Sequence, residues 1–195
     1  MKVIGLTGGI ASGKSTASAY LRELGAAIVD ADAISRASTR RGGAAFEAVC
    51  AAFGNILGAD GEIDRRKLGG IVFADEDARR KLNSIVHPAV MAESRAQIEN
   101  ARASGAKVCI LDVPLLFETG MEKLCDETWL IYVPREEQIR RMAERDGLDA
   151  AAAAARIDSQ MPLEEKLKRA NVAIDSSGTI EQTREKLRCL WEERT

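Results

Sequence analysis

A glycine-rich segment near the start of the chain carries the residue types of a phosphate-binding loop. Residues 8–15 read Gly-Gly-Ile-Ala-Ser-Gly-Lys-Ser and fit the pattern G-x-x-x-x-G-K-[ST]. The two pattern glycines permit backbone angles and a close approach that a Cβ would forbid, so peptide N–H groups can converge on phosphate oxygens. The lysine places a charge between the β- and γ-phosphates, and the serine after it can bind Mg²⁺. A glycine-rich turn that only packs is the alternative to this nucleotide site.

The pattern also assigns single positions to ATP. Thr16, one residue further into the expected helix, is placed to contact the α-phosphate. A dinucleotide-binding G-x-G-x-x-G is excluded, because Ile10 stands where that pattern needs its middle glycine. The residues of this segment expected to contact ATP are Gly9, Ala11, Ser12, Gly13, Lys14, Ser15 and Thr16.

Two carboxylates stand at the end of the second apolar segment. Asp30 and Asp32 lie at the edge where parallel α/β sheets bind ligands. Side chains two residues apart on a strand point the same way, so one carboxylate could accept a hydroxyl proton and the other support it. This placement favours Asp32 as the general base of a phosphoryl transfer. The alternative is that Asp32 caps the helix that follows.

Arginines gather in a helical pattern over residues 135–170. Arg141 and Arg145 are four residues apart and share a helix face, where their guanidinium groups could close on a transferring phosphoryl group. Arg140 and Arg156 belong to the same candidate lid. A solvated charged face is the alternative for this run.

The rest of the chain narrows the reaction. A guanine-nucleotide switch needs N-K-x-D after a late strand, and the chain has no such motif. Residues 175–178 match D-x-x-G but follow the last expected strand, the wrong place to sense a γ-phosphate. A mechanical ATPase usually needs more elements than 195 residues supply. A small phosphotransferase remains, which needs an acceptor site, a base and a cationic lid.

Five apolar segments of strand length alternate with helical patterns and must position these groups. Such alternation indicates a parallel sheet with right-handed crossovers, and hence an α/β fold. The third segment is nearly continuously apolar, as expected of a parallel strand covered on both faces. The five expected strands cover residues 3–6, 26–30, 107–112, 128–133 and 172–175.

The helical patterns fill most of the chain between these strands. Pro88 lacks a backbone N–H and disfavours helical geometry at His87, which predicts a break or kink there. Asp149 stands where it could cap the helix of the six-alanine run that follows it. Helix is expected over residues 15–24, over most of 33–104 with breaks at 41–43 and 54–61, over 135–170, and in a last helix ending near 191.

Composition sets the broad class. The chain has 195 residues and a formal net charge of −2, which excludes a general nucleic-acid binder. Its apolar stretches are too short to span a membrane, and the first residues lack the cleavage region of a signal peptide. We expect a cytoplasmic α/β protein. The only histidine is His87, and the four cysteines are too far apart for a zinc site or a disulfide framework, so we expect them to be reduced and mostly structural.

At this point the chain resembles the dephospho-coenzyme A kinase family. The resemblance covers essentially the whole chain, with the motifs in the family's order. The matching pieces are Leu6 to Thr16, Asp30-Ala31-Asp32, His87-Pro88, Pro114 to Glu118, Arg145-Asp146, Arg156, Gln160, Lys166 and the segment 170–178. The chain departs from the family at Asn171 and Ser176, where the family commonly has Asp and Asn, in segments expected to contact the base.

The resemblance implies an activity and an architecture. The activity is phosphorylation of the ribose 3′-hydroxyl of dephospho-CoA by ATP and Mg²⁺, giving CoA and ADP, the last step of CoA biosynthesis. The architecture is a P-loop NTPase fold with a five-stranded parallel sheet flanked by helices. It has three parts: a core over about 1–31, 105–139 and 166–195, an acceptor-binding helical insertion over about 32–104, and a lid over about 140–165.

Site residues follow from the resemblance position by position. The implied catalytic residues are Asp32, Lys14 and Arg145, with Arg145, Asp175 and Gly178 added to the ATP site. Ser15, and Asp112 through water, are the implied Mg²⁺ ligands, although an aspartate that ends a strand is also a common turn residue. The implied acceptor site consists of Asp32, His87, Leu115, Leu116, Phe117, Glu118, Arg140 and Arg156.

Some alternatives stay open. His87 is equally well explained as a structural contact. A kinase of another small alcohol or nucleotide would share the scaffold, and a nucleotide-dependent regulator or ATPase without an acceptor would share the phosphate-binding loop. Beyond the small-molecule acceptor dephospho-CoA, no nucleic acid, membrane or obligatory protein partner is expected.

Overall fold

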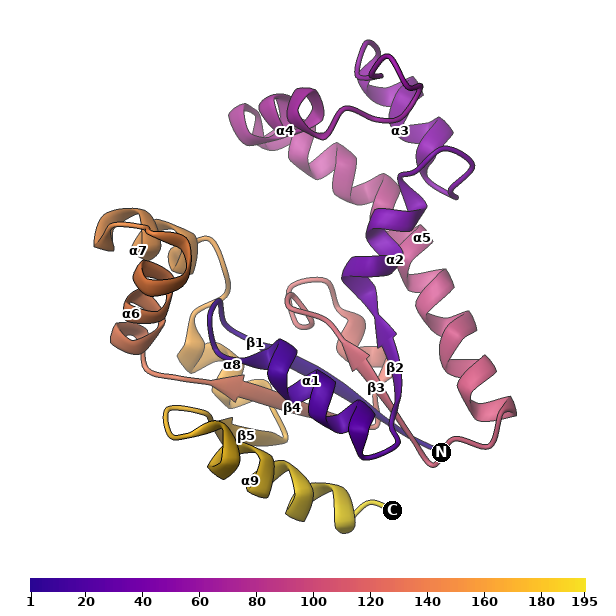
Figure 1. Cartoon of the computed structure of the whole chain (residues 1–195). Helices are drawn as coiled ribbons and strands as arrows, with labels where there is room; N and C mark the ends of the chain where they lie inside the picture. The colour runs from indigo at the N-terminus through magenta and orange to yellow at the C-terminus, as the bar shows by residue number, and fades with distance from the viewer. The chain divides into compact units, whose positions relative to one another are not determined.

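The computed structural model describes residues 1–195, which form two compact units (Figure 1). Unit 1 consists of Met1–Val29 and Ile98–Thr195, and unit 2 of Asp30–Gln97. Unit 2 falls almost entirely within the segment expected to bind the acceptor. None of the helices combines the length and the apolar composition that crossing a bilayer needs.

Five parallel strands form the sheet, which confirms the expected α/β class. Their order is β2-β3-β1-β4-β5, with β1 parallel to both β3 and β4, and β4 parallel to β5. All five strands expected from the sequence are present, so the segments that follow them meet at one edge of the sheet. The bounds are β1 (Lys2–Gly8), β2 (Ala27–Asp30), β3 (Val108–Asp112), β4 (Glu127–Tyr132) and β5 (Val172–Asp175).

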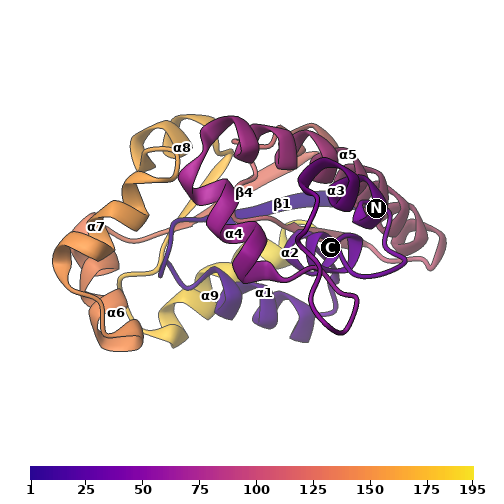
Figure 2. The ribbon, with the colours of Figure 1, turned by 90° about the horizontal axis from the view of Figure 1, so that it is seen from above.

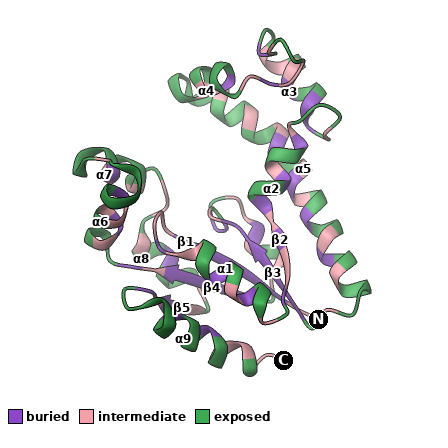
Figure 3. Ribbon diagram, viewed as in Figure 1, coloured by how far each residue is buried: buried purple, intermediate pink, exposed green.

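Helices cover both faces of the sheet in unit 1. α1 (Lys14–Glu23) and α9 (Ile180–Glu192) lie side by side on one face, and α8 (Leu163–Arg169) lies on the other (Figure 2). The three inner strands, β1, β3 and β4, are buried over most of their length (Figure 3), because each large apolar side chain removed from water contributes about 1.5–3 kcal/mol. The central cluster includes Ile4, Leu6, Leu21, Ile110, Trp129, Ile131, Ile174 and Leu187.

The helical pattern over residues 135–170 is divided into three helices. They are α6 (Arg135–Asp146), α7 (Ala150–Asp158) and α8. Gly147 ends α6 in the left-handed conformation with φ 67°. Asp149 caps α7, and its side chain accepts the N–H of Ala152 at 2.7 Å, as the sequence predicts. A short 3₁₀ turn, η1 (Met121–Leu124), precedes β4.

Unit 2 is helical, with α2 (Ala31–Ser38), α3 (Phe46–Phe53), α4 (Arg65–Ala74) and most of α5 (Glu76–Ala103). Of the predicted break or kink at Pro88, the break is wrong, because α5 continues through it, and the kink stays a prediction. Proline removes one N–H bond from the helix, but Val86 and Val90 on either side are both buried. Packing of the turns before and after Pro88 therefore outweighs the lost bond.

Candidate active site

The phosphate-binding loop, residues 8–15, joins the end of β1 to the start of α1 as predicted. Gly13 has φ 84°, a conformation that favours glycine, and occupies the N-cap position of α1. A Cβ on Gly8 would lie 2.7 Å from the carbonyl oxygen of Ile131, so only glycine fits this approach to β4. Ala11 also has a positive φ, of 58°. Both pattern glycines thus have a geometric cause in this structure.

The amino end of α1 is open to an anion. No side chain caps this helix, and its first turn holds no acidic residue. Ser15 and Thr16 of that turn are exposed. The first N–H groups of a helix have no partner within it, and the helix dipole favours negative charge at this end. A phosphate group is the natural ligand for such a terminus.

Three successive carbonyl groups of the loop are held outward by side chains from other elements. Arg141 and Gln138 come from α6, and Ser176 comes from the segment between β5 and α9. Because a trans peptide points its C=O and N–H in opposite directions, these bonds orient the loop's N–H groups away from those side chains. The bonds run from Gln138 Nε2 to Ile10 O at 2.8 Å, from Arg141 Nη1 to Ala11 O at 3.4 Å, and from Ser176 Oγ to Ser12 O at 2.6 Å.

Lys14 and Asp112 form an ion pair at the edge of the sheet. Only 16% of the lysine side chain and 11% of the aspartate side chain are exposed. Asp112 ends β3 beside Leu6 of β1, two residues before the loop. The pair holds the ammonium group beside the loop, so its charge is in place before a nucleotide arrives.

A cavity of about 230 Å³ lies on the α9 side of the loop. Its lining brings Gly13, Thr16 and Gly178, three of the predicted ATP residues, together with Arg141 and Ser176. Asp175 is not part of this lining. Its carboxylate accepts the hydroxyl of Ser177 at 2.5 Å and the N–H of the same residue at 2.8 Å, which lowers the pKa of the carboxyl group.

Of the four arginines predicted to belong to a lid, Arg141 contacts the phosphate-binding loop and the other three do not. Arg141 contacts the loop and also donates to Ser176 O at 2.8 Å. Arg140 pairs with Glu137 and Glu144, each at 2.6 Å. Hydrogen bonds from Arg140, and then from Arg141, lower the pKa of Glu137 to about 2. The two remaining lid arginines share one carboxylate: Arg145 pairs with Asp146 at 2.8 Å, and Arg156 lies 3.9 Å from it.

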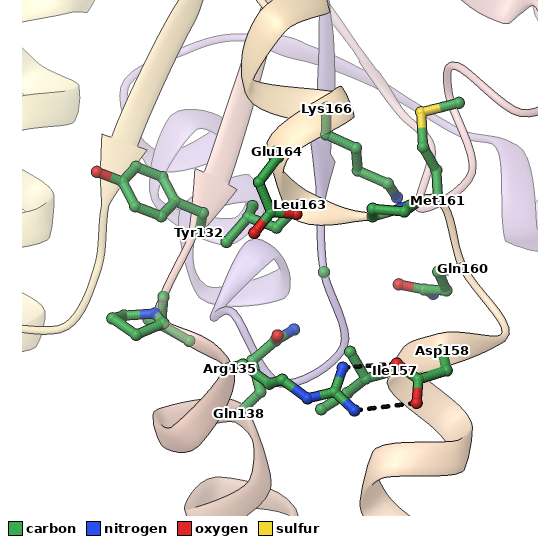
Figure 4. Close-up of a pocket in the computed structure, with 14 residues that line it drawn as sticks. Tyr132, Arg135, Gln138, Ile157, Asp158, Gln160, Met161, Leu163, Glu164 and Lys166 are labelled. Carbon is green, nitrogen blue, oxygen red and sulfur yellow. Dashed lines mark hydrogen bonds and ion pairs between the residues drawn. The ribbon is translucent and has the colours of Figure 1, made fainter.

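A second cavity, of about 400 Å³, lies between α6, α7, α8 and Gly9 of the loop (Figure 4). Tyr132, Ile157 and Leu163 give it apolar walls, and an ion pair at 2.6 Å joins Arg135 to Asp158 across one side. The cavity reaches the loop at Gly9, against which the amide group of Gln138 lies.

Lys166 lines the same cavity and is the most deeply buried charged residue of unit 1, with 1% of its surface exposed. Its ammonium group pairs with Glu118 at 2.9 Å, and Glu118 also accepts the N–H of Met161 at 3.1 Å. Glu118 therefore ties the segment after β3 to the segment between α7 and α8.

The other predicted acceptor residues of unit 1 differ in exposure. Leu116 is fully buried against Gly5 of β1, and Phe117 is buried under the Arg169 guanidinium at 4.7 Å. Leu115 is 39% exposed. The structure thus gives Leu116 and Phe117 a packing role and leaves Leu115 and Glu118 at the surface.

In unit 2, Asp30 rather than Asp32 caps α2. The Asp30 carboxylate accepts the N–H of Ala33 at 2.9 Å, so the alternative that Asp32 is the cap is wrong. The expected alignment of both carboxylates along a strand is also wrong, because the helix begins at Ala31. Asp32 is exposed in the first turn of α2, and His87 is exposed on α5.

Sequence reasoning missed Gln138 and Ser176 as supports of the loop, and it gave Lys166 no role. It also misplaced Asn171. The Asn171 side chain accepts the N–H of Thr128 at 2.8 Å, at the start of β4. Because the strands are parallel, this position lies at the edge of the sheet opposite the loop, not in a segment that contacts the base.

Known proteins resemble the chain over its length. A family model described as dephospho-CoA kinase matches residues 2–182. The dephospho-CoA kinase of Carboxydothermus hydrogenoformans is 53% identical over 188 residues, 96% of this chain and 91% of that protein. A Thermus thermophilus crystal structure is 36% identical with a TM-score of 0.84, covering 100% of this chain and 98% of that one.

A dephospho-CoA kinase structure from Campylobacter jejuni has a TM-score of 0.68 at 28% identity, covering 100% of this chain and 97% of that one. Family model, relative and structures therefore agree over nearly the full length, on a chain whose phosphate-binding loop is built as the sequence predicts. The chain belongs to the dephospho-CoA kinase family, which catalyses the final ATP-dependent step of coenzyme A biosynthesis.

Proposed function

We propose that this chain transfers the γ-phosphoryl group of Mg²⁺-bound ATP to the 3′-hydroxyl of dephospho-CoA, in line and without a covalent enzyme intermediate. The observation that carries the proposal is the phosphate-binding loop, with three carbonyl groups held outward and Lys14 fixed beside it by Asp112. Phosphoryl transfer depends on positioning and on charge stabilisation more than on covalent chemistry of the protein. A preorganised loop supplies both.

The side chains beside the phosphate-binding loop suit the coordination of Mg²⁺. No group of three or more His, Cys, Asp or Glu side chains in the structure could enclose a metal ion. Mg²⁺ in nucleotide sites needs no such group, because it takes one or two protein ligands and completes its shell with phosphate oxygens and water. The exposed Ser15 hydroxyl would hold it directly and Asp112 through water. Bound there, the ion would neutralise charge on the β- and γ-phosphates.

Each remaining step belongs to a side chain of the enzyme. Asp32 accepts the proton of the 3′-hydroxyl as that oxygen attacks. Lys14 and Arg141 stabilise the charge of the ATP phosphates. Arg145 joins them on lid closure, and it must first exchange its partner Asp146 for phosphate oxygens. Arg140 and Arg156 face the same exchange before they can bind the acceptor.

Lid closure over both substrates limits hydrolysis. Water competes with the 3′-hydroxyl as the attacking group, so the reaction needs a site from which water is removed. The lid over residues 140–165 contains α7 and borders the cavity at Gly9, whose apolar walls suit this role. The residues of unit 2, including Asp32 and His87, supply the acceptor side.

The test is ADP release from Mg-ATP with and without dephospho-CoA, measured on the wild-type chain and on Asp32→Asn. We expect release to require dephospho-CoA and the variant to lose about 10²- to 10⁴-fold in kcat with little change in KM. Glu93→Gln, an exposed charge on α5, serves as the matched control and should keep ordinary activity. Near-normal kcat in Asp32→Asn would remove the base assignment. Release that ignores dephospho-CoA would point to an ATPase or to another acceptor.

A further inference from the structure

The arginines of the two units are used differently. In unit 1 every arginine except Arg22 forms an ion pair with a carboxylate. In unit 2 only Arg79 and Arg80 do so. The arginines of unit 2 without an ion pair are Arg36, Arg40, Arg41, Arg65, Arg66 and Arg95.

Three of these unpaired arginines line one cavity of unit 2, here called the arginine cavity. It has a volume of about 570 Å³ and is lined by Arg36, Arg40, Arg65, Glu62, Ile63 and Leu68, among others. Ile63 and Leu68 are buried and form an apolar floor, whereas the three arginines are exposed. Arg65 Nη2 donates to the carbonyl oxygen of Arg36 at 3.4 Å, so these two residues lie side by side.

The charge of the arginine cavity is not balanced from within. Three guanidinium groups face a single carboxylate, Glu62, whose Oε2 already accepts the backbone N–H of Arg41 at 3.0 Å. The cavity therefore carries two net positive charges. A diphosphate diester carries two negative charges, and guanidinium groups bind phosphate oxygens in a two-point geometry that lysine cannot reproduce.

The spacing along α2 matches the acceptor of the proposed reaction. Asp32 and Arg36 are four residues apart in this helix, so they leave the same face about 6 Å apart along its axis. The covalent path from the 3′ oxygen of a ribose to the phosphorus at its 5′ position also spans about 6 Å when extended. A base at Asp32 thus places a 5′-diphosphate beside Arg36.

We propose that the arginine cavity binds the diphosphate of dephospho-CoA, with Arg36 and Arg65 as its main ligands. This inference rests on the proposed function, because it uses the acceptor of that reaction. Arg36 and Arg65 hold the diphosphate, Arg40 adds charge at the rim, and Glu62 opposes binding. The adenosine 3′-hydroxyl is thereby set one helical turn away, at Asp32.

Steady-state kinetics test the proposal by comparing the KM for dephospho-CoA with the KM for ATP in the same variants. For Arg36→Ala and Arg65→Ala we expect KM for dephospho-CoA to rise about 10- to 100-fold, with KM for ATP within about twofold of wild type. Arg36→Lys should recover only part of the loss, because it keeps the charge without the planar fork. Arg95→Ala is the matched control: it removes an unpaired arginine of unit 2 that does not line the cavity.

A variant that is expected to lower the KM for dephospho-CoA distinguishes a ligand-binding role of the cavity from a structural one. Glu62→Gln keeps an acceptor for the Arg41 N–H and removes the only negative charge of the cavity. We expect its KM for dephospho-CoA to fall about two- to fivefold. A merely structural role predicts an unchanged or higher KM.

Phosphorus NMR observes the ligand group directly. The diphosphate resonances of dephospho-CoA should shift on binding to the wild-type chain, and the shift of the fully bound ligand should be smaller in Arg36→Ala and Arg65→Ala. Unchanged KM in both alanine variants, or a bound shift equal to that of wild type, would overturn the inference. Because this measurement needs no turnover, it tests the arginine cavity even if the wild-type chain fails to phosphorylate dephospho-CoA, which would instead refute the proposed function.

Discussion

Unit 1 and unit 2 keep their charged side chains for different purposes. Around the phosphate-binding loop, charges are paired within the protein: Lys14 with Asp112, Lys166 with Glu118, and Arg140, Arg141, Arg145 and Arg156 with acidic residues of α6. In unit 2 the arginines around the arginine cavity have no such partner. Pairing fixes geometry before a ligand binds, whereas unpaired charge is available to the ligand itself.

We attribute this difference to the ligand that we propose for each unit. The phosphate-binding loop must present backbone N–H groups at fixed positions, and only surrounding structure can hold them there. A flexible acceptor with a charged middle segment is recognised by side chains that supply charge and adapt to it. We therefore expect substitution of Lys14 or Lys166 to change ATP use or stability, and substitution of the arginines in the arginine cavity to change the affinity for the acceptor alone.

The largest effect is expected at Lys14. Lys14→Ala removes the charge beside the phosphates and leaves Asp112 unpaired, so kcat/KM for ATP should fall by at least about 10³-fold, in both kcat and KM. Lys168→Ala, whose ion pair with Glu165 lies at the surface, is the matched control and should keep ordinary activity. A Lys14→Ala enzyme with near-normal kcat/KM would contradict the assignment of the loop.

Among the paired charges of unit 1, Lys166 is expected to contribute strongly to folding stability when its pair is intact. Lys166→Met leaves Glu118 without its partner, and breaking a buried pair on one side costs about 3–5 kcal/mol, which the 22% exposure of Glu118 reduces to about 3 kcal/mol. Denaturant unfolding should show this loss, and Lys166→Met with Glu118→Gln should regain part of it.

Denaturant unfolding of Arg36→Ala gives the corresponding measurement for an unpaired charge of unit 2. Its free energy of unfolding should stay within about 0.5 kcal/mol of wild type, because no ion pair is lost. Equal destabilisation by Lys166→Met and Arg36→Ala would end the distinction between paired and unpaired charge.

Low pH should reduce the folding stability of unit 1, because it protonates the Glu127 carboxylate. Hydrogen bonds from Arg194, and further contacts with Lys2 and Trp129, lower the pKa of this carboxyl group from 4.5 to about 2. Because the pKa in the folded state lies below the ordinary value, the stabilisation is complete above about pH 4.5 and is lost as the pH falls towards 2.

Glu127→Gln should therefore cost on the order of 2 kcal/mol at pH 7, and the difference from wild type should shrink below pH 4.5. Unfolding in denaturant at several pH values measures it. Glu193→Gln, which removes the surface partner of Arg194, should cost less than about 0.5 kcal/mol. A pH-independent difference between Glu127→Gln and wild type would show that the carboxylate charge contributes nothing.

The sequence predicted those parts of the fold whose cause is local. Apolar runs of strand length fixed the five strands, and the pattern of residues 8–15 located the loop because glycine is required there by backbone geometry. The break at Pro88 was wrong because tertiary packing of α5 outweighs a local propensity. The predicted alignment of Asp30 with Asp32 was wrong by two residues, since the helix starts at Ala31 rather than after Asp32.

The supports of the loop could not be predicted in the same way. Gln138 lies 128 residues from its partner Ile10, and Ser176 lies 164 residues from Ser12. Nothing in a local pattern distinguishes these side chains from other polar residues near a helix or turn. Arg141 was recognised as a candidate for the lid by its spacing from Arg145, but only the fold shows that Arg141 alone reaches the loop.

The smallest effect is expected at Ser176, and it shows whether a side chain that holds a loop carbonyl group affects ATP binding. Ser176→Ala removes the hydroxyl that donates to Ser12 O, a bond worth about 1 kcal/mol, so KM for ATP should rise about three- to tenfold with kcat and KM for dephospho-CoA little changed. Ser104→Ala, an exposed serine of unit 1 that bonds only its own helix, is the control. If Ser176→Ala instead raised KM for dephospho-CoA and spared ATP, the carbonyl supports would belong to acceptor binding. The division of tasks between the two units would then not follow the pairing of their charges.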